Sequence, residues 1–279
     1  MNSELHSEVS SIERMMSIAN TNGLLQEVVD AYLSYRGAGD SVVEAVCCAL
    51  YDWDLDMKAW SYSSIKAFKT CARQYYEVRV AKNYTVPENT EATLYGKEFH
   101  TAAENYVKDG TPLPQHFVFT RQHLDRLRSI PGTKYCEYKM GLTEKLEPCD
   151  FFDPAVWTRG VADLLIVNEE KGVARVVDYK TGKSAKYADT AQLELMALMV
   201  FKHFPKIKKV RGGLLFVVAN DFKPADYSAD NQHIHWRGWM QDVKKLETAH
   251  ATGVWNPNKT GLCKKHCPVL TCPHNGLNN

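Results

Sequence analysis

The stretch that decides the fold is GVADLLIVNEEKGVARVVDYKTG, residues 160–182. Its two apolar runs are joined by a polar five-residue turn, and this pattern predicts a β-hairpin. Side chains alternate along a strand, so Asp178 and Lys180 are expected to point to the same side of the second strand. Asp163 lies in the first strand. Two carboxylates and an ammonium are therefore expected to meet at one edge of a sheet, which suits a divalent metal ion.

The composition is that of an ordinary soluble globular protein, with 44% hydrophobic and 24% charged residues. A chain of 279 residues is long enough for one large domain, or for a domain with an extension. It contains no apolar run of about 18 residues and no secretory signal at its start. We therefore expect no membrane segment and a cytoplasmic location. Eight cysteines in that setting favour metal or cluster ligation over disulfides.

Charge divides the chain near residue 58. Residues 1–58 carry a net charge of −7, and the remainder carries +8. The first part is predicted to be an acidic helical extension, with helices at 11–19, 24–35 and 42–53. Three roles are open for it: a helical cap on the main domain, a partner-docking module, or an acidic guard over a basic channel. The basic remainder suits a polyanionic partner.

Beyond Trp60 the spacing predicts alternating helices and strands. A serine-rich start caps an amphipathic helix over 61–76, and a longer helix over 91–108 contains His100. A strand over 135–142 carries Glu137 ahead of the hairpin. The other expected elements are a short helix at 121–129, an insertion at 143–156, a helix at 187–204, strands at 210–219 and 232–237, and a helix at 239–252.

The order Gly160-x-x-Asp163, a gap of fourteen residues, Asp178-x-Lys180-Thr-Gly and then Gln192 on the next helix resembles the PD-(D/E)XK nuclease superfamily. Within it the chain is most similar to the RecB-like branch, which includes CRISPR-associated RecB-type nucleases, the AddB nuclease domain and phage exonucleases. The resemblance covers roughly residues 60–275. It implies an α/β fold with a restriction-endonuclease-like core, in which helices flank a mixed central sheet. The nuclease domain is expected over residues 59–279, after the N-terminal helical extension.

The resemblance assigns roles to the hairpin residues. Asp163 and Asp178 are implied to bind Mg²⁺ or Mn²⁺, with a further contact from the backbone carbonyl of Tyr179. Lys180 is implied to position or deprotonate the attacking water and to stabilise the charge that develops on the phosphate. Gln192 is implied to support the lysine or a phosphate.

Two residues outside the hairpin complete the implied site. Gly96-x-x-x-His100 resembles the first nuclease motif of the branch, in which the histidine joins the metal ligands. Glu137 stands where the branch often has a glutamate near the metal. One position departs from the pattern: the tyrosine that usually follows the motif glutamine by four residues is Met196 in this chain.

The C-terminal segment, about residues 253–279, places Cys263, Cys267 and Cys272 among prolines and lysines. Closely spaced thiolates bind soft metals. In the nucleases that this chain resembles, one cysteine ahead of the active-site motifs joins three at the C-terminus around a 4Fe-4S cluster, and Cys71 stands at that position. The spacing Cys-x3-Cys-x4-Cys differs from the commoner Cys-x2-Cys-x5-Cys. A structural Zn²⁺ held by the tail cysteines and a neighbouring histidine is the alternative, and either group would close the nuclease domain.

The function that the resemblance implies is a metal-dependent DNA exonuclease in phage-type recombination, repair or degradation. The alternatives are a DNA endonuclease or end-trimming nuclease, and a non-catalytic DNA-binding recombination accessory protein. No helicase motif is present. The expected partners are DNA with free ends or single strands, a recombination or single-strand-binding protein, and further copies of the chain. Candidate DNA contacts are Arg73, Lys183, Lys186 and the basic cluster at 206–211, with Tyr187 and Trp255 as candidates for base stacking.

Overall fold

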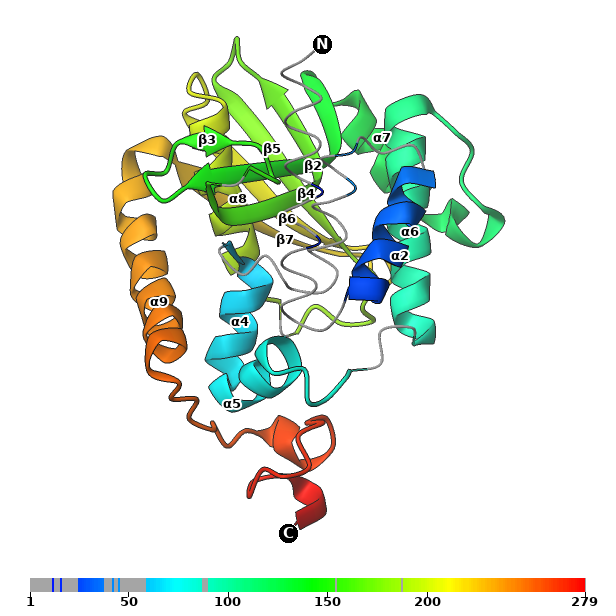
Figure 1. The fold of residues 1–279 in the computed structure, drawn as a ribbon. Coiled ribbons are helices and arrows are strands. Elements are labelled where there is room, and N and C mark those ends of the chain that lie inside the picture. Colours follow the sequence, from blue (N-terminus) through cyan, green and yellow to red (C-terminus); the bar gives the residue numbers. More distant parts are fainter. Residues whose placement is uncertain are drawn as a thin grey trace.

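Seven strands form a mixed central sheet in the order β3-β2-β4-β5-β6-β7, with β1 paired to one end of β4 (Figure 1). The hairpin predicted from residues 160–182 is confirmed: β4 and β5 pair antiparallel, and β5 then pairs parallel with β6. The bounds of the strands are β1 Trp60–Ser61, β2 Thr133–Thr143, β3 Pro148–Cys149, β4 Val156–Asn168, β5 Val173–Lys180, β6 Lys209–Phe216 and β7 Asp221–Ser228.

The computed structural model describes residues 12, 16, 25–37, 42, 45, 59–86, 90–153, 155–186 and 188–278. In the acidic extension it shows helix α2, Leu25–Gly37, which confirms the second of the three expected helices. The other two expected helices lie almost wholly outside the described residues, and so does Tyr187. None of the described helices is long and apolar enough to cross a membrane.

Alternate residues of the central strands pack against different helices. In β4, Leu165 and Val167 belong to a core cluster with α4, α8 and α9, while Leu164 and Ile166 belong to a second cluster with α6 and α7. This alternation is what the apolar hairpin strands require when both faces are covered. The helices are α4 Tyr62–Thr70, α5 Ala72–Tyr75, α6 Glu91–Asp109, α7 Arg121–Ser129, α8 Ala191–His203 and α9 Gln232–Thr252. The expected fold class, helices flanking a mixed sheet, is confirmed.

One glycine lets α8 approach the sheet closely. A Cβ at Gly160 would lie 2.2 Å from Cε of Met196 and 2.9 Å from Sδ of Met199, closer than real Cβ atoms come to their neighbours. Met196 is 3% exposed. The residue at the position of the branch tyrosine therefore packs beneath β4, and it offers no contact to a phosphate.

Two elements differ from the sequence-based expectation near the C-terminus of the domain. The strand expected at 232–237 is wrong, because α9 already begins at Gln232. The last strand is instead β7, which has Pro224 in its middle. A proline lacks the amide proton that a central strand needs, and β7 lies at the edge of the sheet, where this loss is tolerated.

Two helix boundaries also differ. The helix expected over 61–76 breaks at Cys71, whose backbone is extended with φ −163° and ψ 109°. A short α-helix and the π-helical turn Tyr76–Val80 follow. The helix expected from residue 187 begins at Ala191, where the side chain of Asp189 accepts the backbone N–H of Ala191 at 3.0 Å.

Candidate active site

The candidate site lies where β5 parts from β4. The β4–β5 pairing runs from Asn168 opposite Val173 to Leu164 opposite Val177. The same register sets Asp163 opposite Asp178 one position further on, beyond the last pair. Two acidic residues therefore stand at the point where the sheet opens, and they are close enough for the charge of Asp178 to raise the pKa of Asp163.

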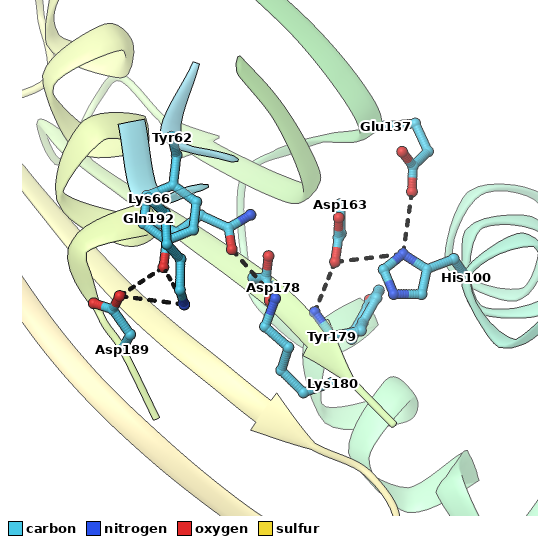
Figure 2. A network of polar contacts seen from close by, with 10 residues as sticks. All are labelled: Tyr62, Lys66, His100, Glu137, Asp163, Asp178, Tyr179, Lys180, Asp189 and Gln192. Atoms are coloured by element: carbon cyan, nitrogen blue, oxygen red, sulfur yellow. Dashed lines mark hydrogen bonds and ion pairs between the residues drawn. The ribbon is translucent and has the colours of Figure 1, made fainter. Parts of the chain in front are cut away.

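Three side chains from three elements form a candidate metal-binding group. His100 comes from α6, Glu137 from β2 and Asp163 from β4, and one ligand atom of each lies within 4.8 Å of the others. Nδ1 of His100 is 3.5 Å from Oδ2 of Asp163 and 3.7 Å from Oε1 of Glu137. Figure 2 shows the two carboxylates converging on the imidazole. Oxygen ligands with one imidazole suit Mg²⁺ or Mn²⁺.

Glu137 enters this group from an unusual backbone conformation. Its φ is +47°, the left-handed region that residues other than glycine rarely adopt. It lies between the pairs Cys136–Leu164 and Tyr138–Ala162, and therefore faces Asp163 across the ladder. Such a conformation costs about 1–3 kcal/mol, and strain of this kind is concentrated at functional sites. The position of Glu137 supports its expected place near the metal.

Lys180 is held between a carboxylate and an amide. Its Nζ lies 2.6 Å from Oδ2 of Asp178 and donates to Oε1 of Gln192 at 3.2 Å. The contact with Asp178 confirms that the two side chains point to the same side of β5. Asp178 is 5% exposed and lies outside the group of three candidate ligands. The structure thus brings four motif residues together at the end of the β4–β5 pairing: Asp163, Asp178, Lys180 and Gln192. Asp163 faces His100, and Lys180 faces Gln192 of α8 (Figure 2).

Tyr179 takes part through its amide. Its backbone N–H donates to Oδ2 of Asp163 at 2.7 Å and so fixes that carboxylate. Its ring is buried, with the ring of Phe99 at 5.6 Å and that of His100 at 5.9 Å. This packing orients the imidazole. The expected metal contact through the Tyr179 carbonyl stays a prediction.

The pKa values of the buried acids and of His100 are shifted by burial and by neighbouring charges. Burial and the charge of Asp178 together raise the pKa of Asp163 to about 7. Burial also raises the pKa of Asp178, although Lys180 opposes the shift. For His100, burial lowers the pKa, but Glu137 and Asp163 outweigh this effect and the net pKa is raised. Buried carboxylates that repel one another are stabilised by a bound divalent ion, so the donor set fits the metal that the resemblance implies.

The Gly-x-x-x-His pattern lies where α6 passes the end of β5. A Cβ at Gly96 would lie 3.4 Å from Oγ1 of Thr181, an ordinary van der Waals contact, so α6 passes beside the residue that follows β5. One helical turn later His100 faces the acid cluster. The signal that pointed to this histidine was the resemblance of Gly96-x-x-x-His100 to the first nuclease motif of the branch.

Three residues beside Lys180 were missed by sequence reasoning. They are Tyr62 and Lys66 on α4 and Asp189 ahead of α8, and the hydroxyl of Tyr62 donates to Oδ2 of Asp189 at 2.8 Å. The two segments are 127 positions apart in the chain. Only the amphipathic helix that holds Tyr62 was predictable, since no motif links the two segments.

The candidate DNA contacts are spread over different parts of the molecule. Lys183 and Lys186 are exposed in the loop that follows Lys180. Arg73 lies beside Cys71, and its Nε is 2.8 Å from Oε1 of the buried Glu77. The basic cluster at 206–211 does not border the site. It begins at the opposite end of β5, and two of its lysines already pair with carboxylates: Lys206 with Glu169 and Lys209 with Asp226.

The C-terminal segment folds beside α5, away from the acid cluster (Figure 1). The backbone N–H of Asn258 donates to Sγ of Cys71 at 3.4 Å, and that of Thr260 donates to Sγ of Cys263 at 3.4 Å. Burial raises the pKa of Cys267, and the neighbouring thiols of Cys263, Cys71 and Cys272 add to the shift. The chain thus brings the four predicted cysteines into one neighbourhood.

Aromatic packing holds this segment against the domain. The ring of Trp255 stacks on Tyr76 at 5.2 Å and contacts Tyr75 and Phe68 at 5.9 and 6.3 Å. Trp255, a candidate for base stacking, therefore already uses its ring to join the end of α9 to α4 and α5.

The sequence matches the family model of the PD-(D/E)XK nuclease superfamily over residues 59–272. This chain belongs to the PD-(D/E)XK nuclease superfamily. It is accordingly a hydrolytic nuclease, for which DNA is the implied substrate and divalent metals are the general cofactors. No curated protein matches the chain.

Two solved structures resemble this superfamily member in fold. SSO0001 is 13% identical, with a TM-score of 0.40 over 78% of this chain and 87% of the other. A protein described as “Putative exonuclease”, from Eubacterium rectale, is 14% identical, with a TM-score of 0.48 over 80% of this chain and 93% of the other.

Proposed function

We propose that this chain is a RecB-like DNA exonuclease that depends on Mg²⁺ or Mn²⁺ and hydrolyses phosphodiester bonds from free ends. The observation that carries the hydrolytic part is the convergence of His100, Glu137 and Asp163 beside the paired Asp178 and Lys180. The exonuclease assignment rests on the order of the motifs, which resembles the RecB-like branch. A role in phage-type recombination, repair or degradation, with a recombination or single-strand-binding partner, belongs to the same proposal.

The residues divide the chemistry between them. A divalent ion held by His100, Glu137 and Asp163, with Asp178 nearby, would supply positive charge to the phosphate and lower the pKa of a bound water. The Tyr179 amide keeps the Asp163 carboxylate in place. Asp178 and Gln192 hold the Lys180 side chain at the edge of the site. There its neutral amine would position the attacking water and accept its proton, and the ammonium so formed would stabilise the charge that develops on the phosphate. Lys183 and Lys186, on the loop that leaves Lys180, and Arg73 are proposed to contact the DNA backbone.

Linear DNA is expected to be degraded in Mg²⁺ or Mn²⁺, whereas closed circular single-stranded and plasmid DNA stay intact. An exonuclease needs an end, so circles of the same sequence are matched controls. End-labelled and internally labelled substrates, followed on denaturing gels, distinguish stepwise release of label from internal cuts. Chelation by EDTA should stop the reaction.

Two outcomes would replace this reading. Cutting of closed circles at a rate similar to that of linear DNA would make the protein an endonuclease or end-trimming nuclease. DNA binding without cleavage in either metal would favour a non-catalytic accessory protein.

We further propose that Cys71, Cys263, Cys267 and Cys272 hold a 4Fe-4S cluster that clasps the C-terminal segment to the domain. The support is geometric. The thiols of Cys71, Cys263 and Cys272 all lie near enough to Cys267 to affect its pKa, so the four thiols are neighbours. Backbone N–H groups are also directed at two of these sulfurs, those of Cys71 and Cys263, and such hydrogen bonds are among those that tune iron–sulfur clusters.

Anaerobically purified protein is expected to contain iron and acid-labile sulfide in equal amounts and to be coloured by charge-transfer absorption. Cys267→Ser should lose both, because it removes one thiolate ligand. Cys149→Ser, on β3 at the edge of the sheet, is the matched control and should keep the wild-type iron content. Colourless protein with stoichiometric zinc would replace the cluster by a zinc site.

A further inference from the structure

A pocket of about 270 Å³ lies between α4 and the start of α8. Tyr62, Lys66 and Lys69 of α4 line one side, and Asp189 and Ala191 line the other. Figure 2 shows Tyr62, Lys66 and Asp189 on the side of Gln192, next to the Asp178–Lys180 pair. The charge of Asp178 contributes to the raised pKa of Tyr62, after burial and Asp189, so the hydroxyl lies within electrostatic reach of the acid cluster. The pocket therefore adjoins the site of hydrolysis.

The polar groups of the pocket already hold one anionic oxygen. Oδ2 of Asp189 accepts the Tyr62 hydroxyl at 2.8 Å and lies 3.3 Å from Nζ of Lys66. The lysine also donates to the Tyr62 oxygen at 2.9 Å. A hydroxyl donor and an ammonium on a single oxygen form the contact set that proteins offer to a phosphate oxygen.

The other contacts of these residues show which ion pair of the pocket a ligand anion could replace. The other oxygen of Asp189 accepts the N–H of Ala191, so this carboxylate also caps α8. Lys69 is 2.6 Å from Oδ2 of Asp242 on α9, which compensates its charge. The Lys66–Asp189 pair is exposed, with 51% and 42% of the side-chain surfaces accessible, so a ligand can reach it. A surface pair of this kind is weak and open to replacement by another anion.

We propose that Tyr62 and Lys66 bind a phosphate of the DNA strand adjacent to the scissile phosphate, at the place that Oδ2 of Asp189 takes in the free protein. This inference rests on the proposed nuclease function and names a further part of its substrate site. The bound group is a phosphate of the strand, either a terminal monophosphate or an internal phosphodiester. The tyrosine that the RecB-like branch usually carries on this helix is Met196 here, and Met196 is buried beneath β4. Residue 196 of α8 therefore offers no phosphate contact.

The test measures DNA binding without cleavage, in the Lys180→Ala background. The affinity for a single-stranded oligonucleotide is followed by fluorescence anisotropy in Mg²⁺ over a range of salt concentrations. Each lost phosphate contact lowers the slope of log K against log salt by about 0.7 for single strands. Lys66→Met is expected to lower the slope by this amount and to bind the oligonucleotide more weakly. Lys206→Met, at the far end of the sheet and likewise paired with an exposed carboxylate, should leave the slope unchanged.

Two further variants separate binding from support of the fold. Tyr62→Phe removes a neutral donor, so binding should weaken while the salt slope stays constant. Asp189→Asn keeps an oxygen to cap α8 but removes the competing charge, and binding should tighten. If the contacts of Asp189 with Tyr62 and Lys66 served only to hold α4 against α8, this variant should bind DNA more weakly instead.

The outcomes distinguish this subsite from the proposed function. An unchanged slope for Lys66→Met overturns the subsite, even if the wild-type protein degrades DNA. A reduced slope upholds it, even if the wild-type protein fails to cleave. Three oligonucleotides identify the phosphate: one with a 5′-phosphate, one with a 5′-hydroxyl and one closed into a circle. If Lys66→Met loses affinity only for the 5′-phosphorylated strand, the bound group is a terminal monophosphate. An equal loss of affinity for all three indicates an internal phosphodiester.

Discussion

Replacing Lys180 by alanine is expected to lower the rate of DNA cleavage by roughly 10²–10⁴-fold, the usual contribution of a positioned acid–base group. The ammonium lies 2.6 Å from Asp178 and 3.2 Å from the Gln192 oxygen, so its position is fixed before substrate arrives. Its loss removes an amine that can accept the proton of the attacking water and that, once protonated, places a positive charge near the scissile phosphate. Single-turnover cleavage of an end-labelled strand at saturating protein reports this step, and DNA affinity should change little by comparison.

Lys180→Arg separates the two roles of the lysine. A guanidinium keeps the charge but does not give up its proton near neutral pH, so a base role predicts that arginine is almost as inactive as alanine. An electrostatic role predicts partial rescue. Lys206→Ala removes another lysine paired with a carboxylate, at the other end of β5, and should cleave normally. Wild-type cleavage by Lys180→Ala would remove Lys180 from the mechanism.

The local geometry of the site was predictable because it depends on strand periodicity. Residues two apart in a strand share a side, and Asp178 and Lys180 are in contact. The polar turn fixes the hairpin register, which in turn sets Asp163 opposite Asp178. The resemblance of Gly96-x-x-x-His100 to the first nuclease motif of the branch predicted a histidine beside the hairpin acids, and Nδ1 of His100 lies 3.5 Å from Asp163.

Features that depend on contacts between remote segments were not predictable in this way. The Tyr62–Asp189 hydrogen bond joins two segments with no shared pattern. The left-handed backbone of Glu137 arises inside a strand whose composition gives no sign of it. The basic cluster at 206–211 looked suitable for DNA, but strand direction places it at the wrong end of the sheet. Strand β7 was missed because a proline and several polar residues weaken its pattern, as edge strands permit.

Asp163→Asn is expected to abolish cleavage and at the same time to stabilise the metal-free protein. The carboxylate is buried, and burial with the charge of Asp178 raises its pKa to about 7. Because the folded pKa lies above the ordinary value of 3.8, ionisation costs more in the folded state than in the unfolded state. Stability from this group is full below the ordinary pKa and is lost as the pH rises through about 7. Asparagine does not ionise, so the variant loses no stability in this way as the pH rises. Its side-chain oxygen can still accept the Tyr179 N–H.

Thermal unfolding in EDTA measures this difference. Above pH 7 the variant should be more stable by roughly 0.5–2 kcal/mol, the range usual for stabilising substitutions, which corresponds to a rise of a few degrees in Tm. Below pH 3.8 the pH-dependent part of this difference should vanish. Asp226→Asn, an exposed carboxylate paired with Lys209, is the control and should show no such dependence.

In added Mg²⁺ or Mn²⁺ the wild-type protein should become more stable than Asp163→Asn. A ligand at a hundredfold excess over its Kd stabilises the folded state by about 2.7 kcal/mol. The wild-type protein should gain this stability, because the ion compensates the repulsion among the buried carboxylates, and Asp163→Asn should gain little. Equal stabilisation of both proteins by the metal would place the ion outside the His100, Glu137 and Asp163 group. A metal-free variant less stable than wild type at pH 8 would show that the carboxylate supports the fold, with the hydrogen bond from Tyr179 outweighing the cost of its charge.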